Sequence, residues 1–126
     1  MLGTAHITAF LATTNATRTT SFYGATLGLR LVSEDAFALV FDANGVELRI
    51  QKVEQFTPQP FTAIGWRVAD LAHVVHALGE RGLTFARYPG LQQDALGIWK
   101  APGGARIAWF HDPDGNVLSV AQYPSA

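Results

Sequence analysis

The stretch Phe110–Val120, with the sequence FHDPDGNVLSV, decides the fold of this chain of 126 residues. Its two apolar runs flank a turn around Gly115, a pattern that predicts a strand, a tight turn and a second strand. The stretch Phe41–Ile50, FDANGVELRI, has the same pattern, and its turn residue Gly45 precedes Gly115 by 70 residues (115 − 45). Two copies of one supersecondary unit predict a pseudo-symmetric domain with a pocket between or along its halves.

A strand and a helix are predicted ahead of each hairpin. The apolar run Ile7–Ala12 precedes Asn15, whose side chain suits the N-cap of a helix, and the run Thr62–Val68 precedes Asp70, a second N-cap. The expected helices cover about 16–27 and 71–81, and the remaining expected strands cover 29–33, 37–41, 46–52, 83–87, 98–101, 105–111 and 117–122. The sequence therefore predicts an α+β protein of two β-α-β-β-β modules, with an extra short strand near Trp99. Their curved mixed sheets are expected to surround a cleft, with the helices outside.

The expected organisation is a single domain over residues 1–126. Module one covers about 4–53 and module two about 62–123. The linker over 54–61 contains Pro58 and Pro60, which stop both a helix and a central strand.

Composition excludes several classes of function. The net charge is −1 and no basic stripe is visible, so we expect no nucleic-acid partner. The absence of cysteine excludes disulfides and thiolate catalysis and suits a reducing compartment. No leader pattern and no apolar run of the roughly 18 residues that span a bilayer are present, so we expect a cytoplasmic protein without a membrane partner.

Two stretches resemble signatures of the vicinal-oxygen-chelate superfamily, which includes glyoxalase, bleomycin-resistance and extradiol-dioxygenase proteins. Ser21–Leu29, SFYGATLGL, is similar to the FYxxxLGL signature, and Asp112–Asn116 is similar to the DPDGN turn before the last strand. With the paired module pattern, the resemblance covers nearly the whole chain and implies the superfamily fold. One fold hosts many functions, so activity must be argued from the site.

The resemblance also implies where metal ligands would lie in members that bind a divalent ion. Carried over by position, the four ligand positions are Thr8, Arg49, Ala63 and Ser119. Divalent cations take imidazole or carboxylate ligands, whereas a methyl group offers none and a guanidinium repels a cation. We therefore expect no metal and no other cofactor. A register shifted by two residues would use His6 and Glu47 and would still lack ligands from module two.

The remaining candidate site combines one cation with aromatic side chains. Strand alternation places Glu47 and Arg49 on the cleft face, where Arg49 either pairs with Glu47 or binds an anionic ligand. The same alternation places Trp66 in the core, whereas Tyr88 and Trp99 lie near the extra loop of module two. The predicted ligand-binding residues are therefore His6, Thr8, Glu47, Arg49, Ala63, Tyr88, Trp99 and Ser119.

Three functions stay open on these residues. The first is a metal-independent protein that binds a small molecule of unknown identity. The second is a metal-dependent lyase or dioxygenase, and the third is a metal-free enzyme with Glu47 or His6 as general base and Arg49 as oxyanion stabiliser. A homodimer is expected in each case, because sheet edges and aromatic side chains need to be covered.

Overall fold

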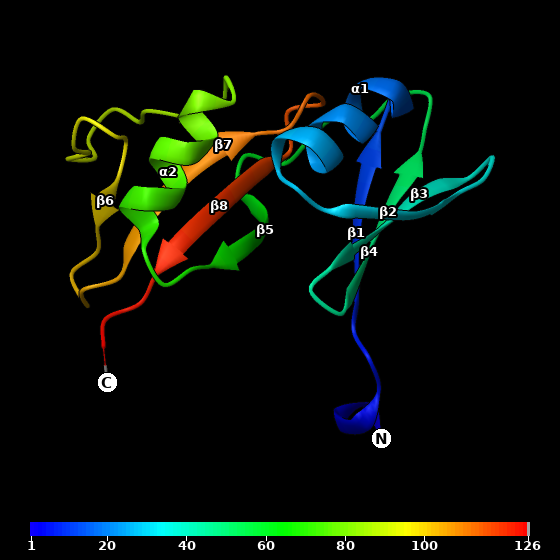
Figure 1. Ribbon diagram of the computed structural model, residues 1–126, viewed down its shortest axis with the longest axis horizontal. Helices are drawn as coiled ribbons and strands as arrows, with labels where there is room; N and C mark the ends of the chain where they lie inside the picture. Colours follow the sequence, from blue (N-terminus) through cyan, green and yellow to red (C-terminus); the bar gives the residue numbers. More distant parts are fainter. Residues whose placement is uncertain (126) are drawn as a thin grey trace. The chain divides into compact units, whose positions relative to one another are not determined.

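A computed structural model describes residues 1–125, which form two compact units (Figure 1). Unit one comprises Met1–Pro58 and unit two begins at Gln59, so the boundary falls within the expected linker. Each unit contains one four-stranded sheet with helical segments on one face, and the class is α+β as predicted. The cleft between the modules stays a prediction.

Unit one contains a mixed sheet with the strand order β1-β4-β3-β2. Its strands are β1 (Thr8–Thr13), β2 (Arg30–Glu34), β3 (Ala38–Ala43) and β4 (Val46–Lys52), and a short 3₁₀ turn, η1 (Leu2–Thr4), precedes them. Strand β1 runs parallel to β4, whereas the other pairs are antiparallel. The turn before β4 uses Asn44 and Gly45, both with positive φ, as the hairpin pattern predicted.

The helical segment of unit one is an α-helix that widens into a π-turn. Helix α1 (Ala16–Ser21) begins at Asn15, whose side chain accepts a hydrogen bond from the Arg18 N–H, and η2 (Phe22–Thr26) continues it. The π-turn places the ring of Tyr23, fully buried, 5.8 Å from the ring of Phe41 on β3. The first expected helix therefore has its predicted cap and approximate end, but not a uniform α-helical geometry.

Unit two repeats the arrangement with the strand order β5-β8-β7-β6. Its elements are β5 (Thr62–Arg67), α2 (Leu71–Glu80), β6 (Trp99–Lys100), β7 (Arg106–His111) and β8 (Val117–Gln122). Strands β5 and β8 are parallel, and β7 pairs with both β8 and β6 in antiparallel fashion. Asp70 caps α2 by accepting a hydrogen bond from the His73 N–H, as predicted.

The prediction of a strand over 83–87 is wrong. Within this segment, the Ala86 N–H donates to the Trp109 carbonyl at 2.8 Å, but no ladder forms. The Gln93 side chain instead donates to the Ala86 carbonyl and accepts from the Tyr88 N–H. These bonds occupy backbone groups that a neighbouring strand would need. The short strand β6 is therefore the edge strand of the sheet beside β7.

The core of each unit lies between its sheet and its helix. In unit one, Leu39, Leu48 and Ile50 are buried on the helix side, and in unit two Leu71, Phe110 and Leu118 are fully buried. Trp66 also lies on the helix side, with its ring stacked 6.4 Å from that of Phe110, as alternation along β5 predicted. The opposite face of each sheet is called its open face below.

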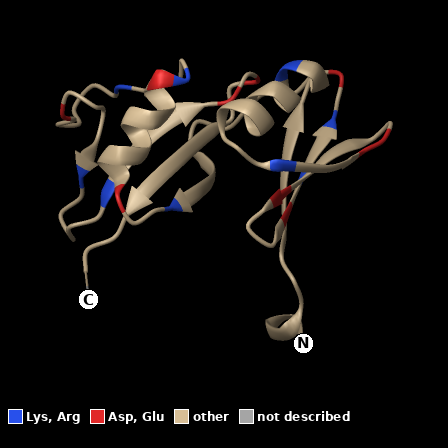
Figure 2. Ribbon diagram, in the orientation of Figure 1, with Lys and Arg blue, Asp and Glu red and all other residues tan. Residues whose placement is uncertain are grey.

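Charged side chains are dispersed over the ribbon, with Lys and Arg interspersed among Asp and Glu (Figure 2). None of the helices in residues 1–125 is long and apolar enough to cross a membrane.

Candidate ligand-binding faces

The open face of sheet one presents the polar side chains of β4. Because Leu48 and Ile50 are buried on the helix side, Glu47 and Arg49 project from the other face. In the sheet register, Arg49 lies between Phe10 on β1 and Val40 on β3. Arg49 therefore occupies an interior position of the sheet, flanked by apolar side chains.

Arg49 is half-buried, and its side chain forms no hydrogen bond or ion pair with any residue of 1–125. The pairing with Glu47 that the sequence left open is therefore not found among these residues. Lys52, on the same strand, does pair, with Glu34 at 2.6 Å. A half-buried guanidinium without a hydrogen-bonded partner has donors that an anionic group can use.

The charge of Arg49 affects the pKa of Asp35, which lies in the turn between β2 and β3. The pKa of the Asp35 carboxyl is lowered from its ordinary value of 3.8, first by hydrogen bonds from the Phe37 and Ala38 N–H groups. Arg49 and Lys52 lower this pKa further through their positive charges. Asp35 therefore stays ionised to lower pH than an ordinary aspartate.

The open face of sheet two carries an aromatic cluster formed by Tyr88, Trp99 and Trp109. The Tyr88 ring meets the Trp109 ring edge to face at 5.6 Å, and the Trp99 ring lies 5.9 Å from that of Trp109. Ala108 and Phe110, the neighbours of Trp109 on β7, are buried on the helix side, so Trp109 belongs to the open face. All three aromatic side chains are partly exposed and offer ring faces or edges to a ligand.

Ser119 lies beside Trp109 on the adjacent strand and opposite Gly65 on β5. A Cβ at position 65 would collide with the Ser119 Oγ and would approach the Ser119 carbonyl oxygen to 3.2 Å. A larger residue at position 65 would therefore force the Ser119 hydroxyl to move and would crowd the Ser119 carbonyl oxygen. The hydroxyl fills the space that a side chain at position 65 would occupy.

A cation also lies on the open face of sheet two. The Arg67 guanidinium carbon lies 4.3 Å above the centre of the Tyr123 ring, which is a cation–π contact. The two residues border a hollow of 530 Å³ at the carboxyl ends of β5 and β8. Each open face therefore carries an arginine.

The four positions at which the resemblance implied metal ligands form two pairs, Thr8 and Arg49 in unit one and Ala63 and Ser119 in unit two. Arg49 lies opposite Phe10 and two residue pairs away from Thr8, which lies opposite Glu47. Ser119 lies opposite Gly65 and near Ala63, where the β5 register shifts. A methyl group, two hydroxyls and a guanidinium do not form a ligand set for a divalent cation.

The alternative ligands do not form a metal site either. His6 is exposed and precedes β1, whereas Glu47 lies opposite Thr8 on β4. Within neither unit, over residues 1–125, do three His, Asp or Glu side chains come together in a way that could hold a metal ion. The residues present do not fit the divalent ion of metal-dependent proteins with this fold.

The sequence predicted several of the residues on these faces as ligand-binding residues but omitted Trp109, Arg67 and Tyr123. It singled out Tyr88 and Trp99, which the structure brings together, but not Trp109, which joins them. The available signal was the alternation along 105–111, which places Trp109 on the face opposite to Phe110. The convergence of Thr8, Arg49, Ala63 and Ser119 on one cleft stays a prediction.

No family model and no curated protein sequence matches the chain. Solved structures are similar over nearly its whole length. A bleomycin resistance determinant encoded on the transposon Tn5 is 22% identical with a TM-score of 0.75, covering 97% of this chain and 100% of that one. A bleomycin-binding protein complexed with bleomycin is 22% identical with a TM-score of 0.73, covering 96% and 100%.

A lactoylglutathione lyase from Agrobacterium tumefaciens is 15% identical with a TM-score of 0.72, covering 97% of this chain and 96% of that one. The similar structures thus include both a binding protein and an enzyme. The chain has the fold shared by glyoxalase and bleomycin-resistance proteins, to which the resemblance in its sequence pointed.

Proposed function

We propose that this protein binds a small organic molecule without a metal ion. The observation that carries the proposal is Arg49, a half-buried guanidinium without a hydrogen bond or ion pair among residues 1–125, at a position where the resemblance implies a metal ligand. A cation at this position repels a divalent ion and attracts an anionic group. The ligand is therefore expected to carry a carboxylate, phosphate or similar group.

The aromatic cluster supports the proposal that the ligand is an organic molecule. Tyr88, Trp99 and Trp109 provide a surface on which planar or apolar groups stack favourably. Ser119 beside Trp109 adds a hydroxyl that can donate or accept a hydrogen bond. In this proposal Glu47 and Thr8 act as polar neighbours of Arg49 on the open face of unit one.

Bleomycin is a natural first probe, because a structure with the same fold is complexed with it. Two cations on the open faces, Arg49 and Arg67, and a net charge of only −1 argue against a cationic drug as the ligand. An anionic aromatic compound suits these faces better.

Divalent metals are expected not to stabilise the protein. Protein purified without a chelating tag should contain no stoichiometric metal by elemental analysis. Addition of nickel, zinc or manganese should leave the melting temperature unchanged in a thermal-shift assay. A bound metal at a hundredfold excess over Kd would add about 2.7 kcal/mol, which is easily detected. The variant His73→Ala/His76→Ala controls for weak binding at the exposed histidines of α2.

A stoichiometric ion that is lost in Glu47→Gln but not in the double histidine variant would contradict metal independence. The metal-dependent lyase or dioxygenase would then become the better function.

We also propose that the protein is a homodimer. Unit one exposes Ile7 and Phe37 at 74% each and Phe10 at 54%, and all five residues of its edge strand β2 are exposed. Exposed apolar side chains beside an open sheet edge are typical of a surface that another chain covers. Light scattering at micromolar concentration should give twice 13.6 kDa, and a monomer mass would refute the dimer.

A further inference from the structure

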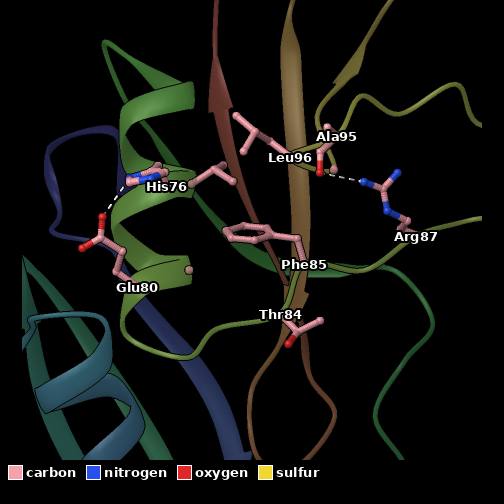
Figure 3. A pocket seen from close by; sticks show the side chains of 10 residues that line it. His76, Glu80, Thr84, Phe85, Arg87, Ala95 and Leu96 are labelled. Carbon is pink, nitrogen blue, oxygen red and sulfur yellow. Dashed lines mark hydrogen bonds and ion pairs between the residues drawn. The ribbon is translucent and has the colours of Figure 1, made fainter.

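A pocket of 430 Å³ lies on the helix side of unit two, away from the open face of sheet two (Figure 3). It is called the outer pocket here. It is lined by helix α2 and by the segment between α2 and β6, through Val75, His76, Gly79, Glu80, Thr84, Phe85, Arg87, Ala95, Leu96 and Gly97. The open-face arginine Arg49 and the aromatic cluster take no part in it.

The floor of the outer pocket is apolar and firmly packed. Val75 is 3% exposed, and the Phe85 ring lies edge to face against the buried Phe110 ring at 5.7 Å. Figure 3 shows Phe85 and Leu96 between α2 and Arg87. An apolar group of a ligand would be removed from water on this floor.

Arg87 provides the cation of the outer pocket, and the backbone holds it in place. Its Nη2 donates hydrogen bonds to the Asp94 carbonyl at 2.7 Å and to the Ala95 carbonyl at 3.0 Å. The Nη1 and Nε groups donate to no residue of 1–125, and Arg87 forms no ion pair with these residues. The Asp94 carboxylate accepts instead from the Leu96 and Ile98 N–H groups. The guanidinium is thus positioned while it keeps donors for a carboxylate.

The segment that carries Arg87 is fixed by side-chain hydrogen bonds. Gln93 bonds to the backbone of Ala86, Tyr88 and Gly97 at 2.8–2.9 Å. Module one has no counterpart, because β2 begins only a few residues after η2. This insertion builds the outer pocket in unit two, and such hydrogen-bonded loops often carry binding functions.

Helix α2, which forms one wall of the outer pocket, has a glycine at a position with room for a larger side chain. Gly79 lies within α2, and no heavy atom lies within 4 Å of the Cβ that another residue would place there. Glycine inside a helix costs about 1 kcal/mol relative to alanine. On either side of this gap, His76 Nδ1 lies 3.0 Å from Glu80 Oε1, so the carboxylate nearest the pocket already has a side-chain partner.

We propose that the outer pocket is a second small-molecule site, which binds a monocarboxylate with a compact apolar body. The carboxylate accepts a hydrogen bond from Nε of Arg87, and the apolar body rests on Phe85, Leu96 and Val75 beside Gly79. This site does not depend on the proposed function of the open faces. Its ligand would bind at a different place from the ligand of the open faces, and through Arg87 in place of Arg49.

The test uses 3-phenylpropionate as the probe and its neutral amide as the matched ligand, with the full-length protein. Titration followed by amide NMR should shift the Gly79, Leu96 and Gly97 signals, and the amide should bind at least tenfold more weakly than the acid. Arg87→Gln should weaken binding of the acid at least tenfold, while Arg18→Gln, an exposed arginine of unit one, should leave it unchanged.

A second variant fills the outer pocket without removing its charge. Gly79→Leu places a side chain in the gap and should abolish binding while the melting temperature is maintained or raised, because leucine favours helix more than glycine. The proposal would be overturned by equal affinity for acid and amide, or by binding that neither Arg87→Gln nor Gly79→Leu weakens. Absence of detectable binding at about 10 mM probe, a concentration at which weakly bound fragments are seen, would also overturn it. Shifts confined to the Trp99 and Trp109 indole signals would overturn it too, because they would place the acid on the open face.

Discussion

Phe110→Ala is expected to lower the free energy of unfolding by about 3–5 kcal/mol, the usual cost of truncating a fully buried phenylalanine. The Phe110 side chain is completely buried on the helix side of β7. Its ring contacts two others, with Trp66 stacked at 6.4 Å and Phe85 edge to face at 5.7 Å. Truncation removes both contacts and leaves a cavity between the sheet and α2. Urea unfolding followed by far-UV circular dichroism measures the loss.

Phe10→Ala is the matched control for this prediction. Phe10 is also a phenylalanine on a strand, but it lies on the open face of sheet one and is 54% exposed. Its truncation should cost less than about 1 kcal/mol in the monomer, since surface substitutions have small effects. Equal losses in the two variants would show that Phe110 is less tightly packed than the structure indicates. A loss for Phe10→Ala that depends on protein concentration would instead support the proposed homodimer.

The parts of the fold that local chemistry determines were predictable from the sequence. Asn15 and Asp70 cap their helices because a short oxygen-bearing side chain satisfies a free N–H group wherever it stands at a helix start. Gly45 and Gly115 adopt positive φ because their tight turns require it. Such features depend on a few neighbouring residues, so a single sequence reveals them.

The features that the sequence did not reveal depend on contacts between separate segments. The strand expected over 83–87 does not form, because the Gln93 side chain takes backbone groups of Ala86 and Tyr88. Nothing in the local pattern distinguishes a glutamine with this role from an exposed one. The same holds for Trp109, which becomes part of the site through the rings of Tyr88 and Trp99 on other segments.

The candidate site was predictable in its chemistry and less so in its arrangement. Strand alternation correctly placed Glu47 and Arg49 on one face, because side chains along a strand alternate by geometry. Whether Arg49 pairs with Glu47 depends on rotamers and neighbours, and the structure shows no such pair among residues 1–125. The outer pocket was not foreseen at all, since it arises from an irregular loop held by hydrogen bonds.

The two hairpin turns that reveal the repeat should differ in their energetic importance. Asp112 is 5% exposed, and its Oδ1 accepts hydrogen bonds from the Asp114 and Asn116 N–H groups at 3.0 Å each. Its Oδ2 accepts from the Asn116 side-chain amide at 2.8 Å. Asp42, 70 residues earlier (112 − 42), has a side chain that is 37% exposed and accepts one such bond, from the Gly45 N–H.

Asp112→Ala should therefore lower the free energy of unfolding by about 3 kcal/mol, because it leaves buried donors without an acceptor. Asp42→Ala should cost about 1 kcal/mol or less, since water replaces the lost acceptor at an exposed turn. Asp112→Asn keeps one oxygen acceptor and should fall between these values. Urea unfolding of the three variants gives the comparison. If Asp42→Ala cost as much as Asp112→Ala, burial would not be what separates the turns, and the assignment of the DPDGN turn as the more important of the two would be wrong.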